Sequence, residues 1–223
     1  MLFADMEFTT KLESVITDAV TTVDDVQQQC LLAIANKFVA VSVPPLFVRK
    51  AREFVTGTDV RVATMVGFPY GYSAVEAKLA EVLLSIVDGA DEIKLMINIT
   101  AIKNNDWQCV GKEINGIRQV TRSQNKSLRV CIEAGMLTRE EIIKCCDIYG
   151  LAGVDALITS SGFSEHTIAE DIAFIRSCLN DSVSLHAYCD GSFKQAKTFL
   201  EEGAGRLLSR NVVTLLHEYA SLN

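Results

Sequence analysis

Val154-Asp155-Ala156-Leu157-Ile158-Thr159-Ser160-Ser161-Gly162-Phe163 is the segment of this sequence that is most informative about its fold. A mostly apolar run that ends in Thr-Ser-Ser-Gly predicts a buried parallel strand whose carboxyl end opens into a polar loop. A helical pattern follows this loop from Thr167 onward. In α/β barrels the chemistry lies at the carboxyl ends of the strands, so we expect the functional site at this loop.

Strand patterns and helical patterns alternate along the rest of the chain. We predict strands over Leu2 to Asp5, Lys37 to Val43, Val60 to Val66, Glu92 to Ile99, Leu128 to Glu133, Val154 to Ser160, Val183 to Ala187 and Arg206 to Ser209. Helical patterns lie between them, for example over Ala74 to Asp88, Asp106 to Arg122, Thr138 to Tyr149, Thr167 to Leu179 and Lys194 to Glu202. Gly89, Gly150 and Gly203 stand where three of these helices are expected to end.

This alternation predicts an α/β fold, a (β/α)8 TIM barrel of parallel strands that forms one domain over residues 1–223. An open dinucleotide-binding sheet is disfavoured because no GxGxxG motif follows the first strands.

Composition limits the classes of partner and the compartment. The net charge of −7 argues against nucleic-acid and anionic-membrane partners, since both need a basic surface. No signal-peptide pattern or membrane-length apolar run is found, so we expect a cytoplasmic protein. The seven cysteines are odd in number and have no CxxC spacing, which favours reduced core residues over disulfides or a metal site. We therefore expect neither a metal nor a cofactor.

Four segments of the chain closely resemble the deoxyribose-phosphate aldolase family, in the order and with nearly the spacing of that family. They are Val62 to Gly71, Gly89 to Ile99, Val130 to Thr138 and Thr159 to Phe163. The resemblance implies a TIM barrel and, for ordinary members, a class I aldolase. Such an enzyme cleaves 2-deoxy-D-ribose 5-phosphate to glyceraldehyde 3-phosphate and acetaldehyde through a Schiff base on a lysine.

The sequence departs from this family at the residues that the chemistry needs. The resemblance places the Schiff-base lysine at the position of Ile158 and the proton-shuttling aspartate at the position of Lys94. An ungapped alignment places the helper lysine at Leu185, and a small shift places it at His186 or Ala187. We therefore predict that the chain does not cleave 2-deoxyribose 5-phosphate.

The phosphate-binding turns implied by the resemblance are altered as well. They become Tyr188 to Gly191 and Leu208 to Asn211, and the preceding glycine-rich segment is shortened to Ser164 to His166. Arg210 is either a residual phosphate ligand or a solvated arginine at a helix end.

Several polar residues fall where the family has its barrel mouth, and they are the candidate substrate-binding residues together with Arg210: Asp5, Asn98, Glu133 and Thr159. A hydrogen-bonded structural set is the alternative interpretation.

Lys94 is the candidate catalytic residue. Alternation along the strand puts Lys94, Met96 and Asn98 on one face, which the resemblance identifies as the barrel interior. A desolvated lysine is either a relocated nucleophile or half of an ion pair, with Glu133 or Asp5 as its predicted partner.

Three functions follow. The predicted one is a catalytically silent binding, regulatory or scaffolding protein, acting on a protein partner that the sequence does not identify. The alternative is an active aldolase or lyase that uses Lys94 on a phosphosugar or another carbonyl substrate. The third is a phosphosugar sensor built from Arg210 and the loop Ser164 to Thr167. The resemblance is also compatible with a homodimer.

Overall fold

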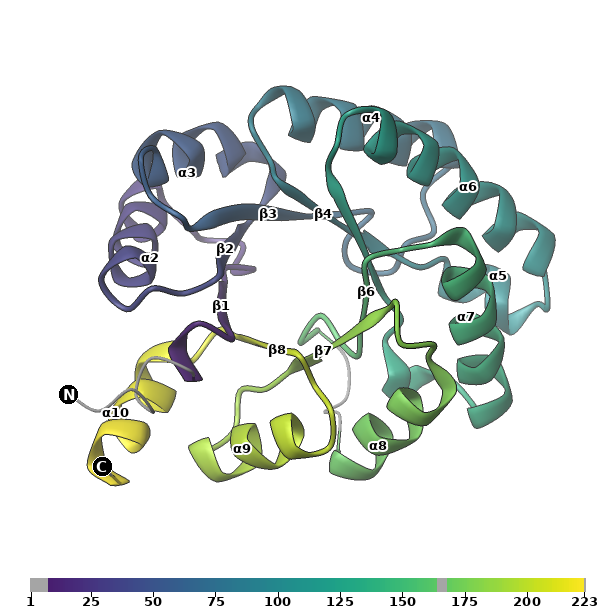
Figure 1. Ribbon diagram of the computed structural model, residues 1–223. Helices are drawn as coiled ribbons and strands as arrows, with labels where there is room; N and C mark the ends of the chain where they lie inside the picture. Colours follow the sequence, from purple (N-terminus) through teal and green to yellow (C-terminus); the bar gives the residue numbers. More distant parts are fainter. Residues whose placement is uncertain (1–7, 164–167, 223) are drawn as a thin grey trace.

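Eight parallel strands close into a barrel in which every strand pairs with its neighbours in chain order (Figure 1). The computed structural model describes residues 8–163 and 168–222. The strands are β1 Leu12–Val15, β2 Ala40–Val43, β3 Arg61–Val66, β4 Glu92–Met96, β5 Ser127–Cys131, β6 Ala156–Ile158, β7 Ser184–Tyr188 and β8 Arg206–Ser209. The predicted (β/α)8 TIM barrel is thus confirmed.

The barrel closes where the first strand meets the last. Glu13 of β1 is opposite Ala40 of β2 on one side and opposite Leu208 of β8 on the other. Both pairings are parallel. The carboxyl ends of all eight strands therefore lie at the same end of the barrel, which we call the mouth.

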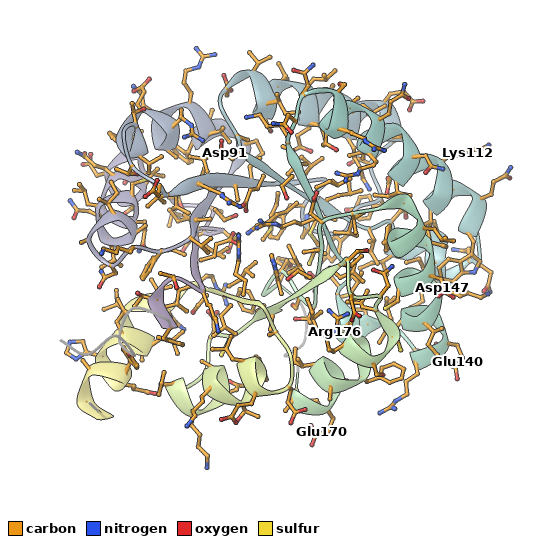
Figure 2. All side chains as sticks on the ribbon, viewed as in Figure 1. Asp91, Lys112, Glu140, Asp147, Glu170 and Arg176 are labelled. Carbon is orange, nitrogen blue, oxygen red and sulfur yellow. The ribbon has the colours of Figure 1, made fainter. Side chains whose placement is uncertain are left out.

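The helices form a ring outside the strands, as Figure 1 shows. They are α2 Val23–Ala35, α3 Val48–Val55, α4 Val75–Val87, α5 Ile99–Lys103, α6 Trp107–Ser123, α7 Arg139–Ala152, α8 Ala169–Cys178, α9 Phe193–Glu201 and α10 Val212–Leu222, with short 3-10 turns at Pro45–Phe47 and Ala134–Met136. Lys112, Glu140 and Glu170 lie on the outer side of this ring, away from the strands (Figure 2). None of the helices in the described ranges is both long enough and apolar enough to span a bilayer.

Two separate apolar clusters reflect the two faces of the strands. Ile93 and Leu95 of β4 pack in the large core between the sheet and the helices, whereas Met96 packs in a second cluster inside the barrel. The alternation predicted for this strand is therefore confirmed, because successive side chains of a strand point to opposite faces.

The first strand was predicted at the wrong place. The structure puts β1 at Leu12–Val15, and the predicted strand over Leu2 to Asp5 lies outside the described residues. The segment Leu12-Glu13-Ser14-Val15 carries two polar residues, so it lacks an apolar strand pattern, yet all four residues are buried. Glu13 is buried because it forms ion pairs inside the barrel.

Some predicted element ends also shift. The strand over Glu92 to Ile99 stops at Met96, because Asn98 begins a short helix. Gly150 lies inside α7, and the helix ends instead at Gly153, which has a positive φ of 68°. Gly89 and Gly203 follow α4 and α9 with positive φ, as predicted.

Candidate functional site at the barrel axis and mouth

The barrel interior holds a charged layer below an apolar one. The charged layer consists of Glu13, Glu92, Lys94, Arg129, His186 and Arg206. The apolar layer consists of Val15, Met65, Met96, Cys131, Ile158, Tyr188 and Leu208. On β1, β4, β5, β7 and β8 the apolar residue follows a charged-layer residue by two positions, so the apolar layer lies closer to the mouth.

Ion pairs connect the charged layer across the barrel axis. Lys94 of β4 donates to Glu13 of β1, and these two strands are not neighbours. Arg206 Nη1 contacts Glu13 Oε2 at 3.0 Å and Glu92 Oε2 at 2.9 Å. Arg129 Nη2 donates to Glu92 Oε1 at 2.6 Å. The ion pair predicted for Lys94 is present, but its partner is Glu13 rather than Glu133 or Asp5, and Asp5 lies outside the described residues.

Burial and the neighbouring charges shift the pKa values of three groups in the charged layer, namely Glu13, Lys94 and His186. Burial alone would raise the pKa of Glu13, but Lys94, Arg206 and Arg129 outweigh burial and lower this pKa to about 2. Burial lowers the pKa of Lys94, and Glu13 opposes that effect. Burial and the neighbouring cations Arg129, Arg206 and Lys94 hold the pKa of His186 well below its usual range. The imidazole of His186 is therefore neutral at pH 7.

The apolar layer covers the charged layer on the side of the mouth. Ile158 is 0% exposed and lies in register between Cys131 of β5 and His186 of β7. Lys94 is 0% exposed as well. The apolar layer therefore lies between the mouth and the amine of Lys94, so a molecule at the mouth contacts apolar side chains first.

The register of β7 decides which residue faces inward at the position of the helper lysine. Tyr188 belongs to the interior cluster, whereas Leu185 and Ala187 pack in the core between strands and helices. Alternation then puts His186 inside the barrel, opposite Ile158. The residue of this strand that faces the candidate site is thus His186, not the Leu185 of an ungapped alignment.

Glu133 is the main acidic residue at the mouth. Its backbone is left-handed, with a φ of 46°, which is uncommon for a residue with a side chain. The buried carboxylate accepts from the backbone N–H of Ser161 at 2.7 Å and from the hydroxyl of Ser160 at 3.2 Å. Glu133 therefore ties the end of β5 to the loop that follows β6.

The other candidate residues, Thr159, Asn98 and Arg210, each make contacts of their own at different places in the fold. Thr159 is buried, and its hydroxyl oxygen accepts from the backbone N–H of Tyr188 at 3.3 Å. Asn98 caps α5 by accepting from the N–H of Ala101 at 3.0 Å. Arg210 pairs with Asp190 at 3.0 Å. These contacts favour structural roles for Thr159 and Asn98. Arg210 is not a free cation, because its guanidinium group is paired with Asp190.

Three charged residues of the site were not identified from the sequence: Glu13, Glu92 and Arg206. Tyr188 and Asp190 stand in a turn that the resemblance implied, but neither was identified as a candidate residue. Glu92 and Arg206 stand inside predicted strands, so their alternation with apolar neighbours was the signal that could have identified them. Glu13 had no such signal, because its strand was not recognised.

Aromatic side chains form an exposed group at the end of β3 and β6, which we call the rim aromatics. Phe163 contacts Phe68 and Tyr70 edge to face, and Tyr70 stacks on Tyr72. All four rings are at least one third exposed to solvent. Over the described ranges, no group of three or more His, Cys, Asp or Glu side chains is arranged to hold a metal ion.

Comparisons with known proteins agree with this geometry. The deoxyribose-phosphate aldolase of Clostridioides difficile is 33% identical over 208 residues, which cover 92% of this chain and 93% of the relative. The deoxyribose-phosphate aldolase of Aciduliprofundum boonei is 35% identical over 198 residues, covering 87% of this chain and 89% of the relative. No protein-family model matches the chain.

Solved structures show the same fold. The deoxyribose phosphate aldolase of Aeropyrum pernix, described as a unique tetramer, superposes with a TM-score of 0.91 at 20% identity, covering 100% of this chain and 94% of that chain. An aldolase called QR15 superposes with a TM-score of 0.90 at 24% identity, covering 96% of each chain. The fold and the sequence similarity define an aldolase-type TIM barrel. The chain belongs to the deoxyribose-phosphate aldolase family.

Proposed function

We propose that this chain is a non-catalytic member of its family, which acts as a binding, regulatory or scaffolding protein. The observation that carries the proposal is the closure of the barrel axis. Lys94, the only lysine in the described strands, is fully buried in an ion pair with Glu13. The apolar layer with Ile158 lies between that pair and the mouth.

Imine chemistry needs an amine that a carbonyl carbon can reach. Freeing Lys94 would require separating it from Glu13 inside the barrel, and breaking a buried ion pair costs about 3–5 kcal/mol. Ile158 has no nucleophilic atom. These two facts support the absence of aldol cleavage.

A binding role is supported by the rim aromatics. Aromatic rings are enriched in protein interfaces and are usually buried when they have no partner to bind. Phe163 and Tyr72 are 53% and 64% exposed, and both rings contact Tyr70, which lies between them. We therefore expect the partner surface to include this rim.

The direct test is turnover of 2-deoxyribose 5-phosphate by the purified chain, measured by the release of acetaldehyde. The Clostridioides difficile relative serves as the positive control under the same conditions. We expect a rate equal to the background without protein. A rate above background that scales with protein concentration, and that the Lys94→Met variant loses, contradicts the proposal.

A second candidate function, an active lyase that uses Lys94, is favoured by one observation. Burial lowers the pKa of Lys94, and a lowered pKa is a property of Schiff-base lysines. Borohydride trapping with acetaldehyde, followed by peptide mapping, separates the two functions. The non-catalytic role predicts no adduct at Lys94. The matched control is Lys78→Met, which removes another buried lysine, paired with Glu113 outside the barrel.

A further inference from the structure

The charged layer of the barrel holds more positive than negative charge. Its carboxylates are Glu13 and Glu92, and its cations are Lys94, Arg129 and Arg206. Each of these five residues is at most 7% exposed. The layer therefore keeps one positive charge out of water without a carboxylate to balance it, which is unfavourable unless an anion joins it.

Two nitrogen atoms of this layer are unpartnered. Arg129 binds Glu92 through Nη1 and Nη2, which leaves its Nε unused. Within the part of the chain that the structure describes, neither Arg129 Nε nor His186 Nδ1 has a hydrogen-bond partner. The two residues are 4% and 5% exposed, and buried polar groups nearly always have a partner. A neutral imidazole can carry its proton on Nδ1, so both nitrogens are available as donors.

The two donors come from the strands on either side of β6. Arg129 of β5 is in register with Ala156 of β6, and His186 of β7 is in register with Ile158, two residues further along β6. Ile158 belongs to the apolar layer inside the barrel, so alternation puts Ala156 inside the barrel as well. The methyl group of Ala156 brings no charge and no hydrogen-bond acceptor to the two donors, and it takes up little room.

Solvent approaches the layer from the amino ends of the strands. A surface depression of about 390 Å³ lies over the first residues of β3, β4 and β5, among them Glu92, which binds Arg129. Three other cations and two other carboxylates line it, so the depression does not supply the missing negative charge: Arg52, Arg61, Lys126, Asp59 and Asp91. The charge excess of the layer is therefore not balanced from this side.

We propose that the charged layer binds one small monovalent anion, such as chloride, held by Arg129 Nε and His186 Nδ1. One negative charge balances the layer, whereas a dianion would leave it with an excess of negative charge. A small ion also suits an interior that the apolar layer closes toward the mouth. This site goes beyond the proposed function, because it concerns the stability of the barrel and neither a partner nor turnover.

The test is the dependence of stability on the anion. Urea unfolding of the unmodified chain is measured in sodium chloride and in sodium gluconate at equal ionic strength, because gluconate is too large to enter the layer. We expect chloride alone to lower the unfolding equilibrium constant, by about tenfold for each tenfold rise in chloride above its dissociation constant. A crystal grown in sodium bromide should show an anomalous peak within hydrogen-bond distance of Arg129 Nε and His186 Nδ1.

Two variants and a control locate the effect. Lys94→Met removes the excess charge and should lose the dependence on chloride, and His186→Leu removes one donor and should weaken it. Lys78→Met removes a buried lysine paired with Glu113 outside the barrel and should keep it. Equal unfolding curves in the two salts, a chloride effect that survives Lys94→Met, or a bromide crystal without an anomalous peak at the layer would each overturn the proposal.

Discussion

Glu13 forms ion pairs with three cations of the charged layer, and its removal is expected to disturb the barrel more than removal of Lys94. The layer contains two carboxylates, Glu13 and Glu92, and three cations, Lys94, Arg129 and Arg206. Loss of a carboxylate increases the excess of buried positive charge. Loss of Lys94 removes that excess and leaves Glu13 paired with Arg206.

This asymmetry gives a prediction at the residue scale. We expect Glu13→Gln to lower the free energy of unfolding by about 3–5 kcal/mol at pH 7, because it leaves buried cations uncompensated. Lys94→Met should cost clearly less. Urea denaturation of both variants measures the difference. An equal or larger loss in Lys94→Met would contradict this account of the layer.

The pH dependence provides an independent check on the same variants. The pKa of Glu13 is about 2 in the folded chain, below the ordinary value of 4.5, so its contribution is complete above pH 4.5 and is lost as the pH falls toward 2. For a single group, this lowering of the pKa corresponds to a contribution of about 3 kcal/mol to the free energy of unfolding. The stability difference between the unmodified chain and Glu13→Gln should therefore shrink on acidification through this window.

At the scale of the elements, backbone conformation decides where helices end. Gly116 lies inside α6, and Gly153 ends α7 with a φ of 68°. A Cβ atom added at either position would meet no atom within 4 Å. The two glycines therefore differ in backbone conformation and not in available space.

The pair gives a matched prediction. Gly116→Ala should stabilise the chain by about 0.5–1 kcal/mol, since alanine is the better helix residue. Gly153→Ala should destabilise it by about 1 kcal/mol or more, because a left-handed backbone is unfavourable for alanine. Thermal unfolding of both variants measures the two signs. A stabilising Gly153→Ala would show that α7 does not end as described.

Element prediction succeeded where the pattern was local. The strands β3, β5, β7 and β8 each lie within two residues of their predicted bounds, because apolar and β-branched residues mark them. β1 failed because half of its residues are polar and are buried only through partners elsewhere in the chain. The end of α7 was misplaced by three residues, because Gly150 and Gly153 both suit a helix end and only the fold distinguishes them.

At the scale of the whole molecule, burial in the folded chain controls the reactivity of the thiols. Among the seven cysteines, only Cys109 and Cys178 are partly exposed. Burial raises the pKa of Cys30 to about 11 and the pKa values of Cys145 and Cys146 to about 12. Because the thiolate is the reactive form, the buried cysteines are doubly protected.

We therefore predict that a chromogenic disulfide reagent at pH 8 labels at most two thiols in the folded chain and seven after denaturation in guanidinium chloride. Labelling of the folded chain should disappear in the variant with Cys109→Ser and Cys178→Ser. Fast labelling of a third thiol under native conditions would show that the barrel opens more readily than its packing indicates.

The βα alternation, the closed barrel class, the aliphatic residue at position 158 and the inward face of β4 with Lys94 could all be inferred from the amino-acid sequence. These follow from periodicity and from local resemblance, which need no knowledge of distant contacts. Three features became visible in the folded chain alone: Lys94 pairs with Glu13, His186 rather than Leu185 faces inward, and Asp190 binds Arg210. Glu13 and Lys94 are 81 residues apart and meet only because the barrel closes, so no local pattern could have paired them.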